Sequence, residues 1–156
     1  MKLRILFFFF VILLSGCVDV EVCDDDSDSE LVAKFKTVNE EVTSDSTVAA
    51  FSLYGIREGK NDSLLYTGLS ASGFVIPLNP HLPFSRFVLT INEQTDTLTI
   101  HHTQEIYMIS YTCGFANRFT LESLEYDSGT IVKDSILIDL VDAEYESGEE
   151  HIWLYL

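Results

Sequence analysis

The stretch Ser85-Arg-Phe-Val-Leu-Thr-Ile-Asn-Glu-Gln-Thr-Asp-Thr-Leu-Thr-Ile-His-His102 decides the fold class. Apolar side chains alternate at Phe87, Leu89 and Ile91, and alternation resumes after the polar linker 92–95. A period of two is typical of strands that bury one face. Two such runs joined by a short polar linker predict a β-hairpin.

The same alternation continues on both sides of this hairpin. Upstream, Leu31, Ala33 and Phe35 are predicted to face a core while Val32, Lys34 and Lys36 face outward. In Thr47–Tyr54 the predicted core positions are Ala49, Phe51 and Leu53. Further strands are predicted at Ser63–Tyr66, Phe74–Leu78, Asp96–His102, Glu105–Cys113, Phe115–Tyr126, Val132–Leu140 and His151–Leu156. Pro77 makes Phe74–Leu78 an edge strand or an irregular crossing.

Roughly nine or ten short strands without intervening helical stripes predict an all-β fold. We expect an antiparallel β-sandwich with an immunoglobulin-like or transthyretin-like Greek key, and a small barrel as the second choice. The chain has 156 residues, of which 47% are hydrophobic, so one domain with a core of ordinary size is expected. We see no internal repeat.

The N-terminus carries a targeting pattern. Met1–Arg4 is basic, and Ile5–Leu14 holds ten residues without a polar side chain. As a helix these ten residues reach only about 15 Å, half of the roughly 30 Å hydrocarbon core, so they are predicted to be a signal peptide and not a membrane span. The following Leu14-Ser-Gly-Cys17 resembles the lipobox of bacterial lipoproteins, which implies cleavage after Gly16 and lipidation of Cys17. The alternatives are an ordinary secretory signal and a short buried helix that ends in a cysteine.

The predicted mature chain begins with an acidic tether. Residues 17–30 contain Asp24, Asp25, Asp26 and Asp28 among seven acidic residues and no base, which is typical of an extended spacer. The stretch also resembles the surface-export signals of Bacteroidota lipoproteins. The predicted organisation is therefore a signal peptide at 1–16, the tether at 17–30 and the β-sandwich at 31–156.

Cys23 and Cys113 remain after the predicted lipidation of Cys17. An even pair in an oxidising envelope predicts a disulfide. Two free thiols or an intermolecular bridge are the alternatives. No CxxC spacing occurs, so thioredoxin-like chemistry and a zinc knuckle are not expected.

Charge and motifs narrow the chemistry further. A net charge of −16 excludes nucleic acid as an expected partner. No phosphate-binding loop and no serine nucleophile elbow is present. The adjacent His101 and His102 would point to opposite faces of a strand and cannot chelate one metal together, so we expect a surface or rim pair. We predict no catalytic residue, metal site or cofactor.

The C-terminal part offers two weaker candidates. The carboxylates at 139, 142, 144, 146, 149 and 150 could hold a cation, although a solvated loop is the simpler interpretation. In the last strand His151, Trp153 and Tyr155 share one face, and Ile152, Leu154 and Leu156 share the other. Trp153 and Tyr155 could stack on a sugar, but a role in an interior strand is favoured.

Segments along the chain resemble a family of uncharacterised Bacteroidota lipoproteins, catalogued as a domain of unknown function. The resemblance is carried by Leu31–Lys36, Phe51–Gly55, Phe74–Asn79, Thr97–Ile100 and Ile109–Phe115, and it covers most of residues 20–140. It implies an exported lipoprotein with paired Cys23 and Cys113, and it supplies no activity.

These observations favour a lipid-anchored, non-enzymatic binding or assembly subunit at the outer membrane. Its expected partners are the membrane, through the lipid anchor, and an outer-membrane protein or a glycan. A surface glycan-binding module is the alternative, and an envelope hydrolase that uses acidic residues is a third hypothesis.

Overall fold

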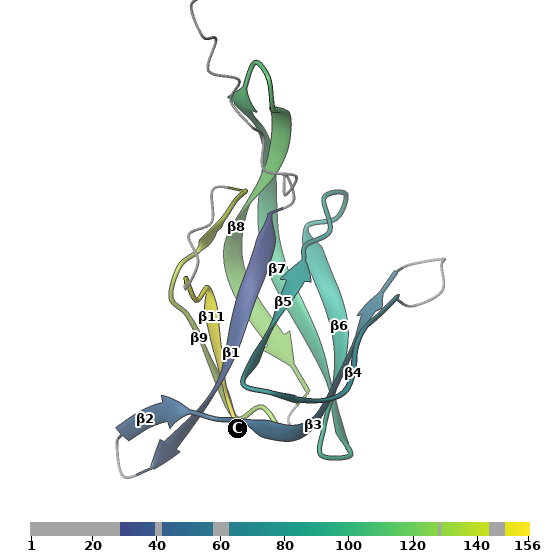
Figure 1. Ribbon diagram of the computed structural model, residues 1–156, viewed down its shortest axis with the longest axis vertical. Coiled ribbons are helices and arrows are strands. Elements are labelled where there is room, and N and C mark those ends of the chain that lie inside the picture. Colours follow the sequence, from purple (N-terminus) through teal and green to yellow (C-terminus); the bar gives the residue numbers. More distant parts are fainter. Residues whose placement is uncertain (1–28, 40–41, 58–62, 128, 144–148) are drawn as a thin grey trace, which may run out of the picture.

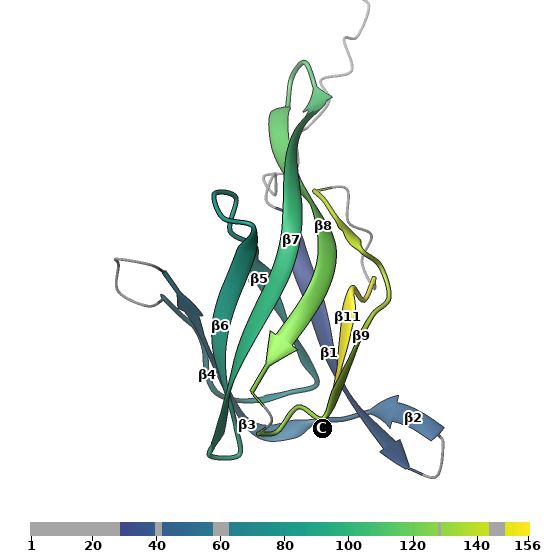
Figure 2. The same cartoon turned by 180° about the vertical axis from the view of Figure 1, so that it is seen from behind.

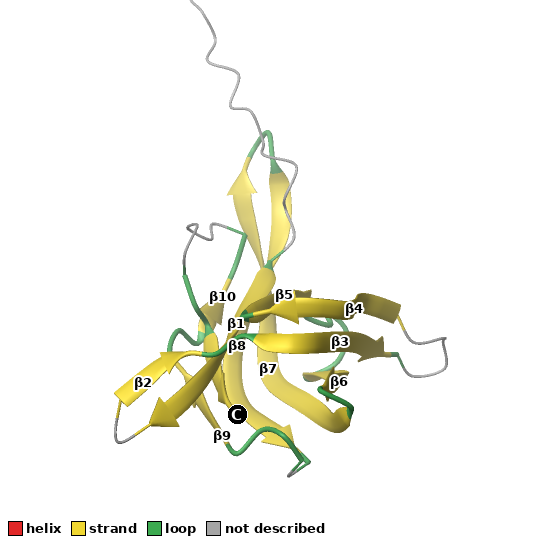
Figure 3. Cartoon of the chain, turned by 60° about the horizontal axis from the view of Figure 1, so that its bottom comes forward, coloured by secondary structure: helices red, strands yellow, loops and turns green. Residues whose placement is uncertain are grey.

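The computed structural model describes residues 29–39, 42–57, 63–127, 129–143 and 149–156. All regular secondary structure in these residues is strand (Figure 3). Two sheets face each other, as the views from the front and from behind show (Figures 1 and 2). The predicted β-sandwich is therefore confirmed.

The smaller sheet has the order β2-β1-β11-β9, with β5 also paired to β1. Its strands are β1 (Glu30–Asn39), β2 (Val42–Asp45), β5 (Gly73–Pro77), β9 (Lys133–Ile136) and β11 (Ile152–Tyr155). β11 lies between β1 and β9, so the last strand is interior, as predicted. However, β1 and β11 run parallel, whereas the sequence predicted an antiparallel sandwich.

The larger sheet has the order β10-β8-β7-β6-β3-β4. Its strands are β3 (Val48–Ile56), β4 (Ser63–Ala71), β6 (Phe84–Ile91), β7 (Gln94–Ser110), β8 (Gly114–Tyr126) and β10 (Leu140–Val141). The hairpin that decided the fold class is β6–β7. Its two turn residues, Asn92 and Glu93, have φ angles of 48° and 73°, and this twist suits a two-residue hairpin turn.

The core lies between the sheets and has the predicted alternation. Leu31, Ala33 and Phe35 of β1 are fully buried, and Phe87, Leu89 and Ile91 of β6 are at most 4% exposed. Phe51 stacks on Phe74 across the sandwich, with ring centroids 5.3 Å apart. Pairing of β5 with β1 confirms that the strand containing Pro77 lies at the border of its sheet.

Irregular pairing explains where the predicted strands were wrong. The register shifts between Val48 and Phe51, so Val48 is buried and Ala49 is exposed, opposite to the prediction. A bulge inserts an extra residue and moves the following side chains to the other face.

Two strand boundaries also differ from the prediction. The runs predicted at 96–102 and 105–113 form the single strand β7, which crosses a register shift at His101/His102 and ends in a turn at 111–113. The run predicted at Val132–Leu140 divides into β9 and β10, which join different sheets.

Candidate functional site

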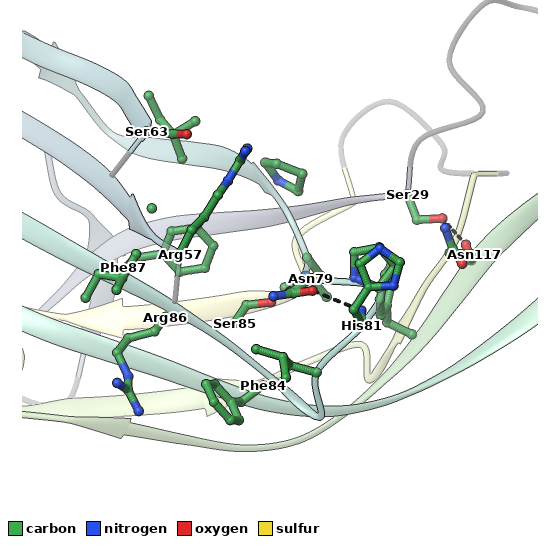
Figure 4. A pocket seen from close by; sticks show the side chains of 18 residues that line it. Ser29, Arg57, Ser63, Asn79, His81, Phe84, Ser85, Arg86, Phe87 and Asn117 are labelled. Atoms are coloured by element: carbon green, nitrogen blue, oxygen red, sulfur yellow. Dashed lines mark hydrogen bonds between the residues drawn. The ribbon is translucent and has the colours of Figure 1, made fainter. Parts of the chain in front are cut away.

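A cleft of about 690 Å³ lies beside the start of β6 (Figure 4). Its walls come from the adjoining ends of β3 and β4, from the segment that joins β5 to β6, from the first residues of β6 and from β8. The apolar side chains that line it include Ile56, Leu65, Leu78, Leu82, Phe87 and Phe119. A volume of this size falls within the range that holds small organic ligands, about 300–1,000 Å³.

Ser85 places a hydroxyl group against this apolar lining. Ser85 is only 4% exposed, because side chains along β6 point alternately outward and inward, and those of Ser85 and Phe87 point toward the core. The backbone N–H of Asn79 donates to Ser85 Oγ over 2.7 Å. His102 Nε2 lies 2.9 Å from the same oxygen.

The surroundings of His102 determine which atom donates in the hydrogen bond between Ser85 and His102. His102 is fully buried, its ring packs edge-on against Phe119, and its Nδ1 has no partner among the described residues. A proton on Nδ1 would be a buried unpaired donor, whereas a proton on Nε2 can be donated to Ser85. We therefore assign the proton to Nε2.

With this tautomer Ser85 Oγ accepts two hydrogen bonds, and its own O–H remains available to an acceptor in the cleft. The same tautomer leaves His102 unable to remove the Ser85 proton, and no group orients the ring through Nδ1. Nucleophilic catalysis needs a base that accepts that proton. The arrangement therefore suits hydrogen bonding to a ligand better than it suits covalent catalysis.

Burial also keeps His102 neutral. Loss of hydration lowers the pKa of His102, and the neighbouring His101 lowers it further. A neutral imidazole at physiological pH is consistent with the donor role assigned to Nε2.

None of the described residues that line the cleft carries a carboxylate, although the chain has 25 acidic residues and a net charge of −16. Arg57 and His81 contribute basic side chains, and the backbone N–H of His81 donates to Asn79 Oδ1 over 2.9 Å. Arg86 also lines the cleft, but its guanidinium lies 5.2 Å over the Phe84 ring on the outward-facing side of β6. This composition disfavours cationic ligands and admits neutral or anionic ones.

Ser29 lies beside the cleft at the start of the described chain. Its hydroxyl donates a short hydrogen bond to the carbonyl oxygen of Asn117 on β8, and both residues line the cleft. The chain that precedes Ser29 therefore meets the domain at this end, next to the β7–β8 hairpin.

A second polar cluster lies on the outer face of the smaller sheet. Lys36 is buried there, 2.6 Å from Asp45 Oδ1 and 3.3 Å from Glu150 Oε2. Its Nζ lies 4.4 Å from the centroid of the Trp153 ring, and the indole N–H donates to Glu150. Burial disfavours the charged form of Lys36, but its two carboxylate partners outweigh this and raise its pKa.

This cluster bears on the prediction that Trp153 and Tyr155 share one face of the last strand and could stack on a sugar. Trp153 and Tyr155 do share the outer face, as the alternation of β11 predicted. Tyr155 is only 7% exposed, and Lys133 Nζ lies 5.1 Å from its ring centroid. One ring face of each aromatic residue is thus covered by an ammonium group, which makes these rings poor platforms for a sugar.

The predicted lipidation, disulfide and tether residues are mostly outside the described residues. Cys17, Cys23, Asp24, Asp25, Asp26 and Asp28 all fall there. Cys113 is described and lies in the turn between β7 and β8. Its pairing with Cys23 stays a prediction.

The histidine pair is placed differently from the expectation. His101 and His102 do point to opposite faces, with His101 Nε2 3.4 Å from Glu125 and His102 in the core. The expectation of a surface or rim pair is therefore wrong for His102, which is fully buried. The sequence could not show that the ladder shifts register between these two residues, or that the His102 backbone N–H donates to the carbonyl oxygen of Pro83.

Two of the four described C-terminal carboxylates, at 139, 142, 149 and 150, form ion pairs with basic groups. Asp142 lies 3.3 Å from Arg118, and Glu150 lies 3.3 Å from Lys36. Glu144 and Glu146 lie outside the described residues. The described residues contain no group of three or more side chains arranged to hold a metal ion, and they form no helix able to cross a membrane.

Sequence reasoning missed Ser85, Asn79 and Arg57 as site residues. The alternation of β6 already indicated that Ser85 faces inward with Phe87. No signal in the sequence indicated that the backbone of Asn79 and the ring of His102 would meet at its hydroxyl group.

Comparison with protein families gives one match. The model described as a family of unknown function (DUF6452) matches residues 47–156, which is more than half of the chain. Searches of curated proteins and of solved structures gave no significant match. The match begins within the segment that leads into β3 and includes every strand that forms the cleft. The chain therefore belongs to the family of unknown function DUF6452.

Proposed function

We propose that this protein is a lipid-anchored, non-enzymatic binding subunit of the cell envelope that holds a small neutral or anionic organic molecule in its cleft. The observation that carries the proposal is the cleft itself: its lining is largely apolar, the described lining residues include no carboxylate, and Ser85 supplies a hydroxyl group. A few placed polar groups in an apolar pocket give a ligand its orientation.

Blocking the cleft tests this proposal directly. Leu82 lines the cleft, whereas Leu64 is 53% exposed and is not among its lining residues. Leu82→Trp is expected to abolish ligand retention in native mass spectrometry of protein purified from envelopes, and Leu64→Trp is expected to retain it. Wild-type protein that carries no copurifying molecule, and that gains no thermal stability from envelope extracts, would contradict the proposal.

Lipidation of Cys17 is the second part of the proposal. Its support is the order of basic residues, apolar segment and Leu14–Cys17 in the sequence. Three acyl chains would anchor the domain stably, because each buried CH₂ contributes about 0.8 kcal/mol. Cys17→Ala is expected to prevent labelling with a fatty-acid probe and to release the protein from the membrane fraction. Membrane retention without label would refute lipidation.

A Cys23–Cys113 disulfide completes the anchor region in this proposal. Cys113 is not free in the structure, and it lies four positions before Asn117, the residue that Ser29 contacts. The six residue steps from Cys23 to Ser29 span about 20 Å when extended, enough to follow the β7–β8 hairpin to its turn. We expect the intact mass of the untreated protein to be lower than that of the reduced protein by two hydrogens per chain.

We further propose that this protein acts at the outer membrane of a Bacteroidota-type envelope, beside an outer-membrane protein. The support is the acidic stretch after Cys17, which resembles a surface-export signal. Crosslinking in intact envelopes is expected to capture a reproducible partner. Protease treatment of intact cells, with a permeabilised control, distinguishes a surface domain from a periplasmic one.

A further inference from the structure

The ends of β7 and β8 form a two-stranded arm, defined here as residues 106–117. The arm projects beyond all other strands at one end of the molecule (Figures 1 and 2). Met108 pairs with Phe115 and Ile106 pairs with Asn117, so the ladder continues to the turn at 111–113. The start of β7, at Gln94, lies at the opposite end of the same 17-residue strand.

One face of the arm and its turn are apolar and exposed, whereas Tyr107 and Ala116 on the other face are half-buried and buried. Tyr111 is 96% exposed, Ile106 and Phe115 are each 69% exposed, and Met108 is 48% exposed. No residue from 106 to 117 is acidic, basic or histidine, although the chain is strongly charged. A two-stranded ribbon is only marginally stable in water by itself, and clustered exposed apolar side chains mark an interaction surface.

Charged groups begin where the arm joins the body. Arg118 follows the arm directly, and its guanidinium lies 3.4 Å from Glu105 and 3.3 Å from Asp142. The arm therefore has an apolar tip above a charged base. The change from an apolar tip to a charged base matches the change from hydrocarbon to head groups and water at a bilayer surface.

The position of the predicted anchor indicates which surface the arm meets. Ser29 contacts Asn117 at the base of the arm, so the chain leaves the domain at this end. Eleven residues lie between Cys17 and Ser29, and the twelve residue steps from one to the other span at most about 40 Å. An anchor at Cys17 would thus hold the arm end of the domain close to the membrane.

We propose that the tip of the arm inserts into the interface of the bilayer to which the chain is anchored. This inference rests on the lipid anchoring proposed above. Five residues of strand from Glu105 to the turn extend about 17 Å, more than the depth of one head-group layer. Tyr111 and Phe115 reach the acyl boundary, and the unpaired backbone edges of the ribbon prevent deeper entry.

Tryptophan quenching by brominated lipid tests the proposal. The chain from residue 18 carries a hexahistidine tag in place of Cys17 and is bound to phosphatidylcholine vesicles through a nickel-chelating lipid. The anchor is then supplied whether or not Cys17 is lipidated in cells. Tyr111→Trp reports on the arm tip, Gln94→Trp reports on the opposite end, and the wild type gives the contribution of Trp153.

We expect brominated phosphatidylcholine to quench Tyr111→Trp about twofold or more, because the tip lies within roughly 5–10 Å of the head-group boundary. Gln94→Trp is expected to show no quenching beyond the wild type. Adding Phe115→Ser to Tyr111→Trp is expected to reduce the quenching, whereas adding Val42→Ser, at a residue 65% exposed on β2, is expected to leave it unchanged.

Two results would overturn the inference. Equal quenching of Tyr111→Trp and Gln94→Trp, or no quenching of either, would mean that the arm does not enter the bilayer. Its exposed apolar residues would then bind a protein partner instead. Blue-shifted emission of Tyr111→Trp without vesicles, reversed by deleting residues 18–28, would mean that the tether covers the arm instead. Failure of Cys17 lipidation in cells would refute the anchor alone, because the vesicle measurement does not depend on it.

Discussion

Removal of the Asp96 carboxylate tests how the segment that follows β8 is held to the sandwich. Asp96 is 2% exposed and accepts backbone N–H groups from Gly129 at 2.8 Å, Thr130 at 2.5 Å and Ile131 at 3.1 Å. Ile131 is itself a core residue. One buried side chain therefore fixes the segment that leads from the larger sheet to β9.

The magnitude follows from these three bonds. A hydrogen bond to a charged group contributes about 1.5–3 kcal/mol, and an unsatisfied buried donor costs about 1–3 kcal/mol. Asp96→Asn keeps an oxygen for Thr130 and Ile131 but turns an NH₂ group toward the Gly129 N–H. We expect it to lower the free energy of unfolding by about 2–3 kcal/mol, and Asp96→Ala by about 3–5 kcal/mol.

Urea denaturation at pH 7 measures this loss. With a slope of about 1–3 kcal/mol/M, Asp96→Asn should lower the midpoint by about 1–2 M without changing the slope. Glu93→Gln is the matched control, because it removes one negative charge from an exposed turn residue, and it should change stability by less than about 0.5 kcal/mol. An Asp96→Asn effect as small as that of the control would refute the reasoning.

A double-mutant cycle checks the same contact from the other side. A Cβ atom on Gly129 would lie 2.2 Å from Asp96 Oδ1, so Gly129→Ala must displace the carboxylate or the loop. Gly129→Ala should therefore destabilise the wild type more than it destabilises the Asp96→Ala variant. Equal effects in the two backgrounds would show that the collision with Asp96 does not determine the cost.

The remaining predictions concern buried basic groups. Burial lowers the pKa of both His102 and His151, so as pH falls below about 6.5 the unfolded chain gains these protons first and stability decreases, by at most about 1.4 kcal/mol per pH unit for each histidine. Urea titrations should give a lower free energy of unfolding at pH 5.5 than at pH 7.5, and this difference should be smaller in His102→Gln than in the wild type. The same difference in both proteins would contradict the assignment to His102. Lys36→Met should lower stability by about 1–2 kcal/mol and alter Trp153 emission, because the ammonium lies 4.4 Å from that ring; identical emission spectra would show that the contact does not form.

The strand pattern was largely predictable, and its errors have local causes. Burial of one face requires an apolar residue at every second position, so Leu31 to Phe35 and Phe87 to Ile91 were assigned correctly. Ala49 was assigned wrongly because a bulge precedes Phe51. A bulge depends on the partner strand, and a single strand's sequence does not contain its partner.

The candidate site was much less predictable. Ser85 is an ordinary strand residue in the sequence, and it becomes a site residue only because Asn79 and His102 meet it at 2.7 Å and 2.9 Å. The arm was equally hidden, since 105–113 and 115–126 read as two ordinary strands. Only the structure shows that these strands extend past the rest of the sandwich (Figure 1).

The sequence by itself determined the fold class, because alternation of apolar residues is a local property that the backbone of a strand converts directly into one buried face. It also determined the acidity of the chain and the candidate anchor at Cys17. Tertiary structure decided where the cleft lies, that His102 is buried, that β1 and β11 run parallel and that the arm projects. Each of these features depends on which distant segments meet, and that choice is made by packing over the whole core and not by any local pattern.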